Sequence, residues 1–150
     1  MGDSYYEQAQ KPSKEIKLPE LDTVTYQYPA NPTVVEHTYP EFTCVCPKTG
    51  LPDFANVTIK YIPTNKIIEL KSFKLYMVAF RNIGIFHEHF TNRILDDFIK
   101  VTKPLCAEII VNVANRGGVY TTVQREYKSK DFIELGPTSQ IFHQWMERRI

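Results

Sequence analysis

The change of hydrophobic period along the chain restricts its fold more than any other feature of the sequence. From Val34 to Tyr127, apolar residues recur first at every second position, then with a helical spacing in two segments, and finally at every second position again. A period of two is typical of half-buried strands, and a period near 3.6 is typical of amphipathic helices. The order strand, strand, helix, helix, strand, strand predicts an α+β domain: an antiparallel four-stranded sheet with two helices on one face.

The four predicted strands differ in how clearly they alternate. Residues 34–46 read VVEHTYPEFTCVC, which is β-rich, and Pro40 within them favours an edge strand or a bend. The other strands lie in residues 54–63, 107–113 and 119–127, with a hairpin turn at the sequence NRGG before the last. The residues expected to share a face are Val57, Ile59 and Tyr61, then Ile109, Val111 and Val113, then Val119, Thr121 and Val123.

Helical periodicity marks the middle and the end of the chain. The apolar stripes are Phe73, Tyr76, Met77 and Phe80 in the first helix and Phe90, Ile94, Phe98 and Val101 in the second. Gly84 separates these helices, and Pro104 lies just past the second. Residues 139–149, SQIFHQWMERR, predict a C-terminal helix that docks through Ile141 and Trp145.

The predicted domain organisation is simple. Residues 1–30 contain many Lys, Glu, Tyr and Pro residues with little periodicity, so we expect an extended N-terminal arm, ordered by a neighbouring subunit. Residues 31–150 are expected to form a single domain. Helices on one side leave the other sheet face and both edges uncovered, and we expect a homo-oligomer to cover them.

Composition excludes several classes of partner. The formal net charge of the chain is +1, which provides no overall field for nucleic acid or an anionic membrane. Apolar runs are too short to span a bilayer, and the polar start MGDSYYEQAQKPSKE lacks a signal core, so a cytoplasmic location is expected. Neither a G-x-G-x-x-G nor a P-loop sequence is present, so any dinucleotide binds by another route.

The segment FTCVCPKTGLPDFA, residues 42–55, contains the strongest candidates for chemistry. Pro47 ends ladder pairing directly after Cys46, which places that thiol at a strand end, and the Lys48 cation favours a thiolate. Asp53 follows a turn with Gly and Pro that allows the chain to fold back. A carboxylate beside a thiol can accept its proton and later return one. A turn-capping Asp beside a chance Cys is the alternative, and the residues alone leave it open.

A zinc site is the rival interpretation of these cysteines. Cys44 and Cys46 form C-x-C, while His87 and His89 form H-x-H. Structural zinc sites usually separate paired ligands by two to four residues, so these pairs match weakly. A disulfide is not expected, because the compartment is reducing and the two cysteines are too close along the chain. Cys106 fits a buried, inert strand residue.

The second predicted helix opens with the sequence FHEHF. Glu88 falls in its first turn, where the helix dipole favours an ionised carboxylate. Such a carboxylate could accept N–H groups of a guanine-like edge. The alternative is that Glu88 only stabilises the start of the helix. His87 either contacts a ligand or caps the helix. Lys71 and Lys74 lie on one helix face and could grip a phosphate, although a solvated face also explains them. Arg116 is a further cation, beside flexible glycines.

Several motifs in sequence order resemble the NADPH-dependent nitrile reductases of queuosine biosynthesis, the 7-cyano-7-deazaguanine reductases, in their short single-module type. That family's signature, E-[SL]-K-[SA]-hydrophobic-K-[LY]-[YW], is matched at every position by residues 69–76, ELKSFKLY. Residues 42–55 resemble the family's nucleophile segment, FRNIGIFHEHF its substrate-binding segment and RGG its late hairpin. The resemblance implies a tunnelling fold (T-fold), whose ββααββ units join through their sheets into rings that stack, with active sites between subunits.

The resemblance also implies a role for each candidate residue. Cys46 would be the nucleophile that forms a covalent thioimide with the nitrile, and Asp53 would be the acid that protonates the nitrile nitrogen. Two hydrides from two NADPH molecules would then take the thioimide through an imine to the primary amine, 7-aminomethyl-7-deazaguanine. The residues expected at the deazaguanine base are Ile68, Glu69, Leu70, His87 and Glu88, and those expected at the NADPH phosphates are Lys71, Lys74 and Arg116. No metal is implied.

Two other functions stay open on the sequence. The same fold includes zinc-dependent GTP cyclohydrolases and pterin enzymes, but their site would need a second cysteine beside a helix histidine, and no good set is present. A non-catalytic T-fold binding protein is the other alternative. The joint presence of Cys46, Asp53 and Glu88 argues against it.

Overall fold

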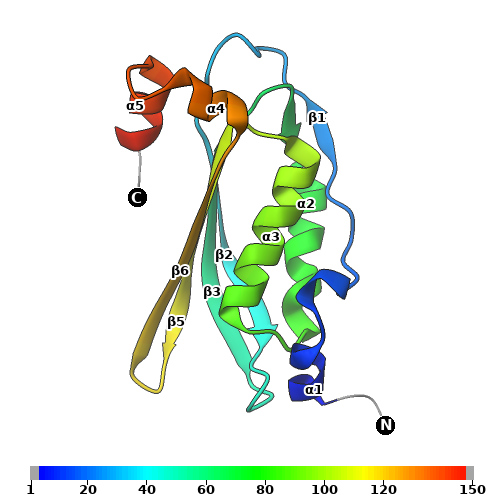
Figure 1. The fold of residues 1–150 in the computed structure, drawn as a ribbon. Helices are drawn as coiled ribbons and strands as arrows, with labels where there is room; N and C mark the ends of the chain where they lie inside the picture. Colours follow the sequence, from blue (N-terminus) through cyan, green and yellow to red (C-terminus); the bar gives the residue numbers. More distant parts are fainter. Residues whose placement is uncertain (1–3, 148–150) are drawn as a thin grey trace.

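The computed structural model describes residues 4–147, and its central element is a four-stranded antiparallel sheet in the order β2-β3-β5-β6. The strands are β2 (Val35–Val45), β3 (Pro52–Ile62), β5 (Cys106–Arg116) and β6 (Val119–Lys128). Two helices, α2 (Leu70–Val78) and α3 (His87–Thr102), cover one face of the sheet (Figure 1). The predicted α+β class and the order ββααββ are confirmed. Residues 1–3 of the expected arm and 148–150 of the expected domain lie outside the described residues.

The hydrophobic core lies between the sheet and these two helices. The predicted inward residues of β3 and β5 are buried, as are all the predicted helix stripe residues except the half-buried Val101. Phe42 of β2 stacks on Phe90 of α3 with ring centroids 4.4 Å apart. Tyr61 of β3 meets Phe98 of α3 edge to face at 4.9 Å. Such aromatic pairs add to the free energy of area burial and hold α3 at a fixed place on the sheet.

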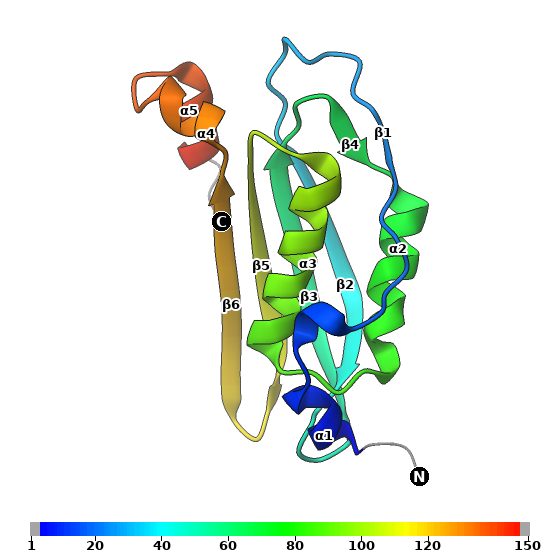
Figure 2. The ribbon, with the colours of Figure 1, turned by 45° about the vertical axis from the view of Figure 1, so that its right-hand side comes forward.

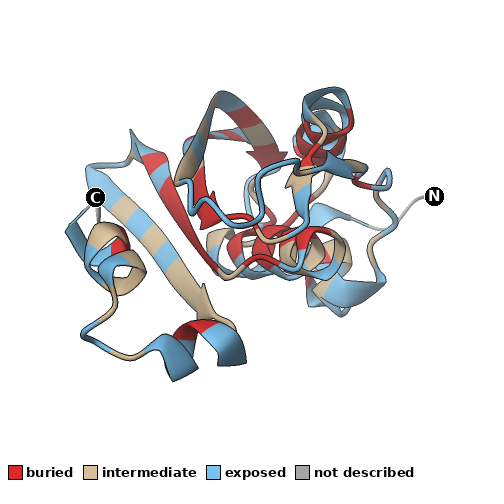
Figure 3. Cartoon of the chain, turned by 90° about the horizontal axis from the view of Figure 1, so that it is seen from above, coloured by how far each residue is buried: buried red, intermediate tan, exposed pale blue. Residues whose placement is uncertain are grey.

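The last predicted strand is buried less than the others. Val119 at its start is 64% exposed, whereas Thr121 and Val123 on the same face are half-buried. β6 is an edge strand, and exposed residues alternate with half-buried ones along most of its length (Figure 3). The β5–β6 hairpin turns at Gly117 and Gly118, whose φ angles of 60° and 82° favour glycine.

β2 forms the other edge of the sheet and carries the irregularity that its proline predicts. The pairing register of β2 with β3 shifts between Tyr39 and Phe42, on either side of Pro40. Proline has no N–H to donate, so the ladder cannot continue through it. After this shift β2 pairs regularly with β3 up to its end at Val45.

The two core helices have well-defined starts and ends. Glu69 caps α2, because its carboxylate accepts the N–H groups of Lys71 and Ser72 at 2.8 and 2.7 Å. After α2 the chain forms a short 3-10 helix, η2 (Ala79–Asn82), and then enters α3. α3 ends as predicted before Pro104, with Lys103 in the left-handed conformation at φ 45°.

The expectation of a wholly extended N-terminal arm is wrong. The arm contains the short helix α1 (Tyr5–Gln10), the 3-10 helix η1 (Ser13–Glu15) and the strand β1 (Thr23–Thr25), which pairs with β4 (Lys66–Ile68). Ser4 and Glu7 form a reciprocal capping box that stabilises α1. From α1 the arm crosses the outer side of α3 and α2 to reach β1 at the opposite end of the molecule (Figure 2). The arm therefore packs along its own chain.

The C-terminal segment lies against the second face of the sheet. The predicted helix is present as α5 (Gln140–Glu147), and a further short helix, α4 (Lys130–Leu135), precedes it. Trp145 is fully buried in a small cluster with Ile62, Cys106 and Phe132. Because Ile62 and Cys106 alternate with core-facing residues, this cluster is separate from the core under α2 and α3.

Candidate active site

The β2–β3 hairpin brings Cys46 and Asp53 to the same end of the sheet. Asp53 is the register partner of Cys44, two residues before Cys46. The Cys46 N–H donates to the carbonyl of Leu51 at 2.8 Å, and the Gly50 N–H donates to the carbonyl of Cys46 at 2.9 Å. These bonds close a tight loop of residues 46–51, which we call the Cys46 loop. The loop turns the chain so that both predicted reactive groups lie beside one cavity.

The Cys46 loop stabilises the thiolate form of its cysteine. Partial burial alone would raise the pKa of the Cys46 thiol. Hydrogen bonds from the Thr49 hydroxyl and from the N–H groups of Thr49 and Lys48 outweigh that effect, and the pKa lies below its ordinary value. The thiolate is the nucleophilic form of cysteine, so the loop favours reactivity at this side chain. Sequence reasoning did not single out Thr49; its position in the turn between Cys46 and Asp53 was the available signal.

The other two cysteines have the opposite environment. Cys44 points into the core and is 1% exposed, and burial raises the pKa of its thiol to about 12. Burial likewise raises the pKa of Cys106 to about 12. All three cysteines are free thiols. The expectation that Cys106 is a buried strand residue is confirmed, and Cys46 alone combines access with a lowered pKa.

The Asp53 carboxylate is held from two sides. It is only 6% exposed. One oxygen, Oδ2, lies 3.2 Å from Nε2 of His87 at the start of α3. The other oxygen, Oδ1, accepts a hydrogen bond from the Arg116 guanidinium, which also donates to the Pro52 carbonyl at 2.8 Å. Two elements, α3 and the end of β5, therefore hold this carboxylate of β3.

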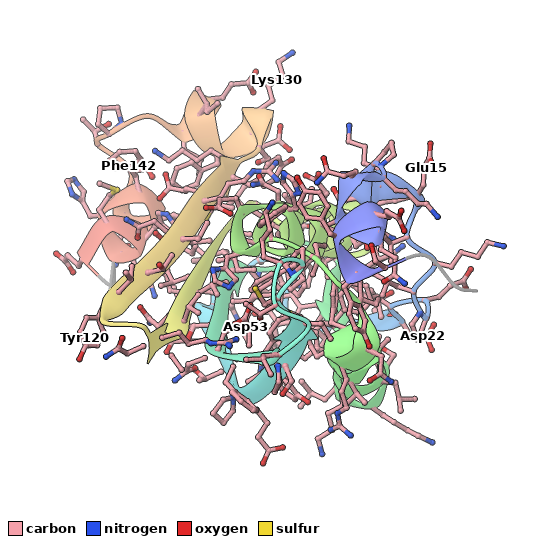
Figure 4. The ribbon with its side chains drawn as sticks, turned by 90° about the horizontal axis from the view of Figure 1, so that it is seen from below. Glu15, Asp22, Asp53, Tyr120, Lys130 and Phe142 are labelled. Atoms are coloured by element: carbon pink, nitrogen blue, oxygen red, sulfur yellow. The ribbon has the colours of Figure 1, made fainter. Side chains whose placement is uncertain are left out.

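These side chains line one open cavity of about 400 Å³. Cys46, Thr49 and Asp53 form one side of it, and His87 and Arg116 contribute from α3 and β5. The remaining wall is built by the β5–β6 hairpin. Figure 4 shows Asp53 near the middle of this end of the molecule, with Tyr120 at the hairpin tip to one side. The volume lies in the usual range for small-molecule sites, roughly 300–1,000 Å³.

The start of α3 places His87 and Glu88 differently. His87 points to Asp53 and lines the cavity. Glu88 is exposed in the first turn of the helix, where a carboxylate interacts favourably with the helix dipole. The structure therefore brings His87 together with Cys46 and Asp53, whereas the Glu88 carboxylate is exposed and does not line the cavity.

The other residues expected at the base lie at the far end of α2 within this chain. Ile68 is 4% exposed in the core, Glu69 caps α2, and Leu70 is 51% exposed. The Cys46 loop is adjacent to the opposite end of the same helix, because Val45 bridges to Gly84 shortly after α2 and η2. The nine residues of α2 span about 13 Å at about 1.5 Å per residue. One copy of the chain therefore does not bring these three residues to Cys46.

The three cations expected at a cofactor are also separated. Lys71 and Lys74 are exposed on α2, near the end that Glu69 caps. Arg116 lies at the cavity, where its guanidinium contacts Asp53. Sequence reasoning did not foresee this contact, because 63 positions separate the two residues and only the β3–β5 pairing makes them neighbours.

Two further findings concern metals and membranes. Among residues 4–147, no group of three or more His, Cys, Asp and Glu side chains is arranged to hold a metal ion. In the same part of the chain, no helix has the length and apolar character that crossing a bilayer requires.

Comparison with known proteins identifies the family. The model of the QueF-like protein family matches residues 52–131, more than half of the chain. The chain belongs to the QueF-like family. Curated relatives of this QueF-like chain include proteins named NADPH-dependent 7-cyano-7-deazaguanine reductase. The one from Chloroherpeton thalassium is 50% identical over 110 residues, 73% of this chain and 95% of the relative. The one from Caldicellulosiruptor bescii is 47% identical over 115 residues, 77% and 88% of the two chains.

A longer match and a solved structure agree with this assignment. The relative of the same name from Nitrosomonas europaea is 42% identical over 135 residues, which cover 89% of the QueF-like chain and 94% of the relative. The crystal structure of the archaeosine synthase QueF-Like in the apo form superposes with a TM-score of 0.61 at 23% identity. It covers 66% of this chain and 97% of that one. This likeness confirms the T-fold expected from the sequence.

Proposed function

We propose that this QueF-like chain is an NADPH-dependent oxidoreductase of tRNA queuosine biosynthesis. It reduces the nitrile of 7-cyano-7-deazaguanine to the primary amine 7-aminomethyl-7-deazaguanine. One observation carries the proposal: a thiol with a lowered pKa, Cys46, lines the same cavity as the buried carboxylate of Asp53. The names of relatives at 42–50% identity supply the substrate and the cofactor.

The first chemical step joins Cys46 to the nitrile. The sulfur bonds to the nitrile carbon, the C≡N triple bond becomes a C=N double bond, and the product is a covalent thioimide. The thiol proton passes to the nitrile nitrogen, and Asp53 is the group placed to transfer it. A thioimide accepts hydride more readily than a nitrile, which is why a covalent step helps the reduction.

His87, Arg116 and Glu88 support this step in different ways. His87 and Arg116 hold both oxygens of Asp53 and so fix the direction in which it delivers a proton. Glu88 directly follows His87 and is exposed, so its carboxylate is accessible to the N–H groups of the deazaguanine ring. Arg116 was expected at a cofactor phosphate. Its contact with Asp53 supports a role at the carboxylate instead.

The residues available for NADPH are Lys71 and Lys74. Both are exposed, and they lie three positions apart, so their ammonium groups share one face of α2 and suit phosphate. Two NADPH molecules, bound in turn, would each supply one hydride: the first reduction lets the C–S bond break, which returns the Cys46 thiol and leaves an imine, and the second reduces the imine to the amine. The chain's own part is to bind the phosphates and to present the covalent adduct at the cavity opening.

The separation of the expected residues supports a homo-oligomer. Glu69 and its neighbours lie at one end of α2, which spans about 13 Å, and the Cys46 loop of their own chain lies past its other end. A second copy can supply them, and both edges of the four-stranded sheet are available for pairing with further copies among the described residues. We propose that each active site lies between subunits of stacked rings. Three free thiols suit a reducing compartment, so the cytoplasm is the proposed location.

An intact-mass experiment tests the proposal. The protein is mixed with 7-cyano-7-deazaguanine in the absence of NADPH, and its mass is recorded before and after NADPH is added. We expect a mass gain equal to that of the nitrile, because addition releases no atom. The gain should be lost in Cys46→Ala, kept in the control Cys106→Ala, and discharged when NADPH is present.

Other outcomes would replace the proposal. An unmodified protein that contains bound zinc would indicate a cyclohydrolase-like enzyme of the same fold. An unmodified protein without metal would indicate a non-catalytic binding protein. An adduct that persists in Cys46→Ala would assign the nucleophile to another residue.

A further inference from the structure

Helix α1 of the N-terminal arm lies directly against the Cys46 loop. The Lys48 ammonium group of the loop lies over the ring of Tyr6, 3.9 Å from its centroid. The ring of the adjacent Tyr5 lies over Gly50, because a Cβ atom there would be 3.6 Å from the ring carbon Cδ2. Two consecutive tyrosines of the arm thus contact the residues on both sides of Thr49. Thr49 is the residue whose hydroxyl and N–H groups stabilise the Cys46 thiolate.

The same helix also contacts the segment behind the loop. A Cβ atom at Gly84 would lie 2.7 Å from the carbonyl oxygen of Tyr5, closer than any side chain tolerates. Gly84 forms a β-bridge with Val45, and the Val45 N–H donates to the Ile83 carbonyl at 3.0 Å. Val45 directly precedes Cys46, so α1 contacts the loop itself and also Gly84, the residue that pairs with the chain just before the loop. Glycine is required at position 84 because the backbone of α1 occupies the space.

α1 is fixed at this place by contacts of its own. The Ser4 and Glu7 capping box defines its start, and Ala9 is buried beneath it. Following α1, the Ser13 carbonyl accepts a hydrogen bond from the Arg93 guanidinium of α3 at 2.5 Å. A six-residue helix is marginal by itself, so these tertiary contacts hold it. The arm is thereby anchored to α3 on one side and to the Cys46 loop on the other.

We propose that α1 is a positioning element for Cys46, acting through the contacts of Tyr6 and Tyr5 with the Cys46 loop. The loop N–H groups and the Thr49 hydroxyl can solvate the thiolate only while the turn keeps its shape. α1 restricts the movement of Lys48 and Gly50, the residues that flank Thr49. Neither tyrosine lines the cavity, so both act through the loop. This proposal rests on the proposed function only in that Cys46 is taken to be the nucleophile of the reaction.

The experiment measures alkylation of Cys46 by iodoacetamide as a function of pH in the full chain, with peptide mass spectrometry to assign the site. Tyr6→Ala should slow alkylation at neutral pH by roughly 3- to 10-fold, since the rate follows the thiolate fraction. The midpoint of the profile should move to higher pH. Tyr6→Phe keeps the ring under Lys48 and should restore the wild-type profile. Tyr28→Ala removes a tyrosine that is 63% exposed elsewhere in the arm and should change nothing.

Tyr5→Ala provides a second, independent variant, and the melting temperature of each variant reports on folding. Unchanged alkylation profiles in both Tyr6→Ala and Tyr5→Ala would overturn the proposal. Iodoacetamide does not depend on the nitrile reaction, so the two proposals can fail separately. Suppose that the wild-type protein gives no nitrile adduct, while the Tyr6→Ala variant shows the shifted alkylation profile. This result would contradict the proposed function and support the positioning role of α1.

Discussion

Nε2 of His87 lies 3.2 Å from Oδ2 of Asp53, although 34 positions separate the two residues in the sequence. The contact joins the first residue of α3 to β3, and Arg116 holds the other carboxylate oxygen from the end of β5. Neither oxygen of Asp53 is therefore free to rotate away from the cavity. A proton-transferring group that is already oriented loses little entropy when substrate binds.

Asp53→Asn removes the proton-transferring group with almost no change in shape. We expect the variant to bind 7-cyano-7-deazaguanine and to turn over about 10²- to 10⁴-fold more slowly, the usual effect of a lost general acid or base. Single-turnover kinetics with intact-mass detection would show slow thioimide formation. Turnover within a few-fold of the wild type would remove Asp53 from the mechanism.

Arg116 and Lys74 are expected to have separable effects. Arg116→Ala frees one oxygen of Asp53, so the maximal rate should fall even at saturating NADPH. Lys74→Ala removes an exposed cation on α2, so the KM for NADPH should rise while the maximal rate stays near that of the wild type. Steady-state kinetics on both variants measure this difference. If Arg116→Ala changed only the KM for NADPH, its place would be at the cofactor, as the sequence suggested.

The three cysteines should differ in their response to pH. The lowered pKa of Cys46 means that its thiolate is present at lower pH than for an ordinary cysteine, whose pKa is about 8.5. The midpoint of its alkylation profile should lie at lower pH than that of a cysteine in a short unstructured peptide. Cys44 and Cys106, with pKa values of about 12, should stay unlabelled over the same range in the folded protein. Labelling of Cys44 as fast as that of Cys46 would contradict the assigned environments.

The sequence predicted the parts of the fold that depend on periodicity. The stripe from Phe90 to Phe98 and the alternation from Val57 to Tyr61 both became core, because hydrophobic burial follows the periods of helix and strand. The arm was predicted less well. Ser4 and Glu7 have the spacing of a capping box, but the stretch after them lacks an apolar stripe, and contacts with the rest of the chain stabilise α1.

The site was predictable only in part, for a similar reason. Cys46 and Asp53 are close in sequence, and a single turn joins them, so local reasoning placed them together. Arg116 reaches Asp53 through strand pairing across the sheet, and no local pattern encodes that contact. Long-range contacts depend on the whole topology, so the sequence suggested a phosphate for Arg116 but could not predict its contact with the Asp53 carboxylate.

Glu88 and His89 form a matched pair for a binding experiment. Both are exposed in the first turn of α3, but only Glu88 has a carboxylate, which can accept two N–H groups of the base at once. Glu88→Ala should raise the Kd for 7-cyano-7-deazaguanine, whereas His89→Ala should leave it close to the wild-type value. Isothermal titration calorimetry on the Cys46→Ala background measures binding without the covalent step. Equal affinity in both variants would show that Glu88 stabilises the start of α3 and does not bind the base.

Mixing two inactive variants tests whether the active site is shared between subunits. Glu69 precedes α2, and the Cys46 loop of the same chain lies past the opposite end of that helix, so Glu69→Gln and Cys46→Ala would damage different surfaces of one intersubunit site. After denaturation and refolding at a 1:1 ratio, random assembly would give about one quarter of the sites both intact residues. The mixture should therefore recover about one quarter of the wild-type activity, while each variant refolded alone stays inactive. Matching melting temperatures would show that Glu69→Gln has not simply weakened the start of α2. A mixture as inactive as its parts would place both residues in a site formed by one chain.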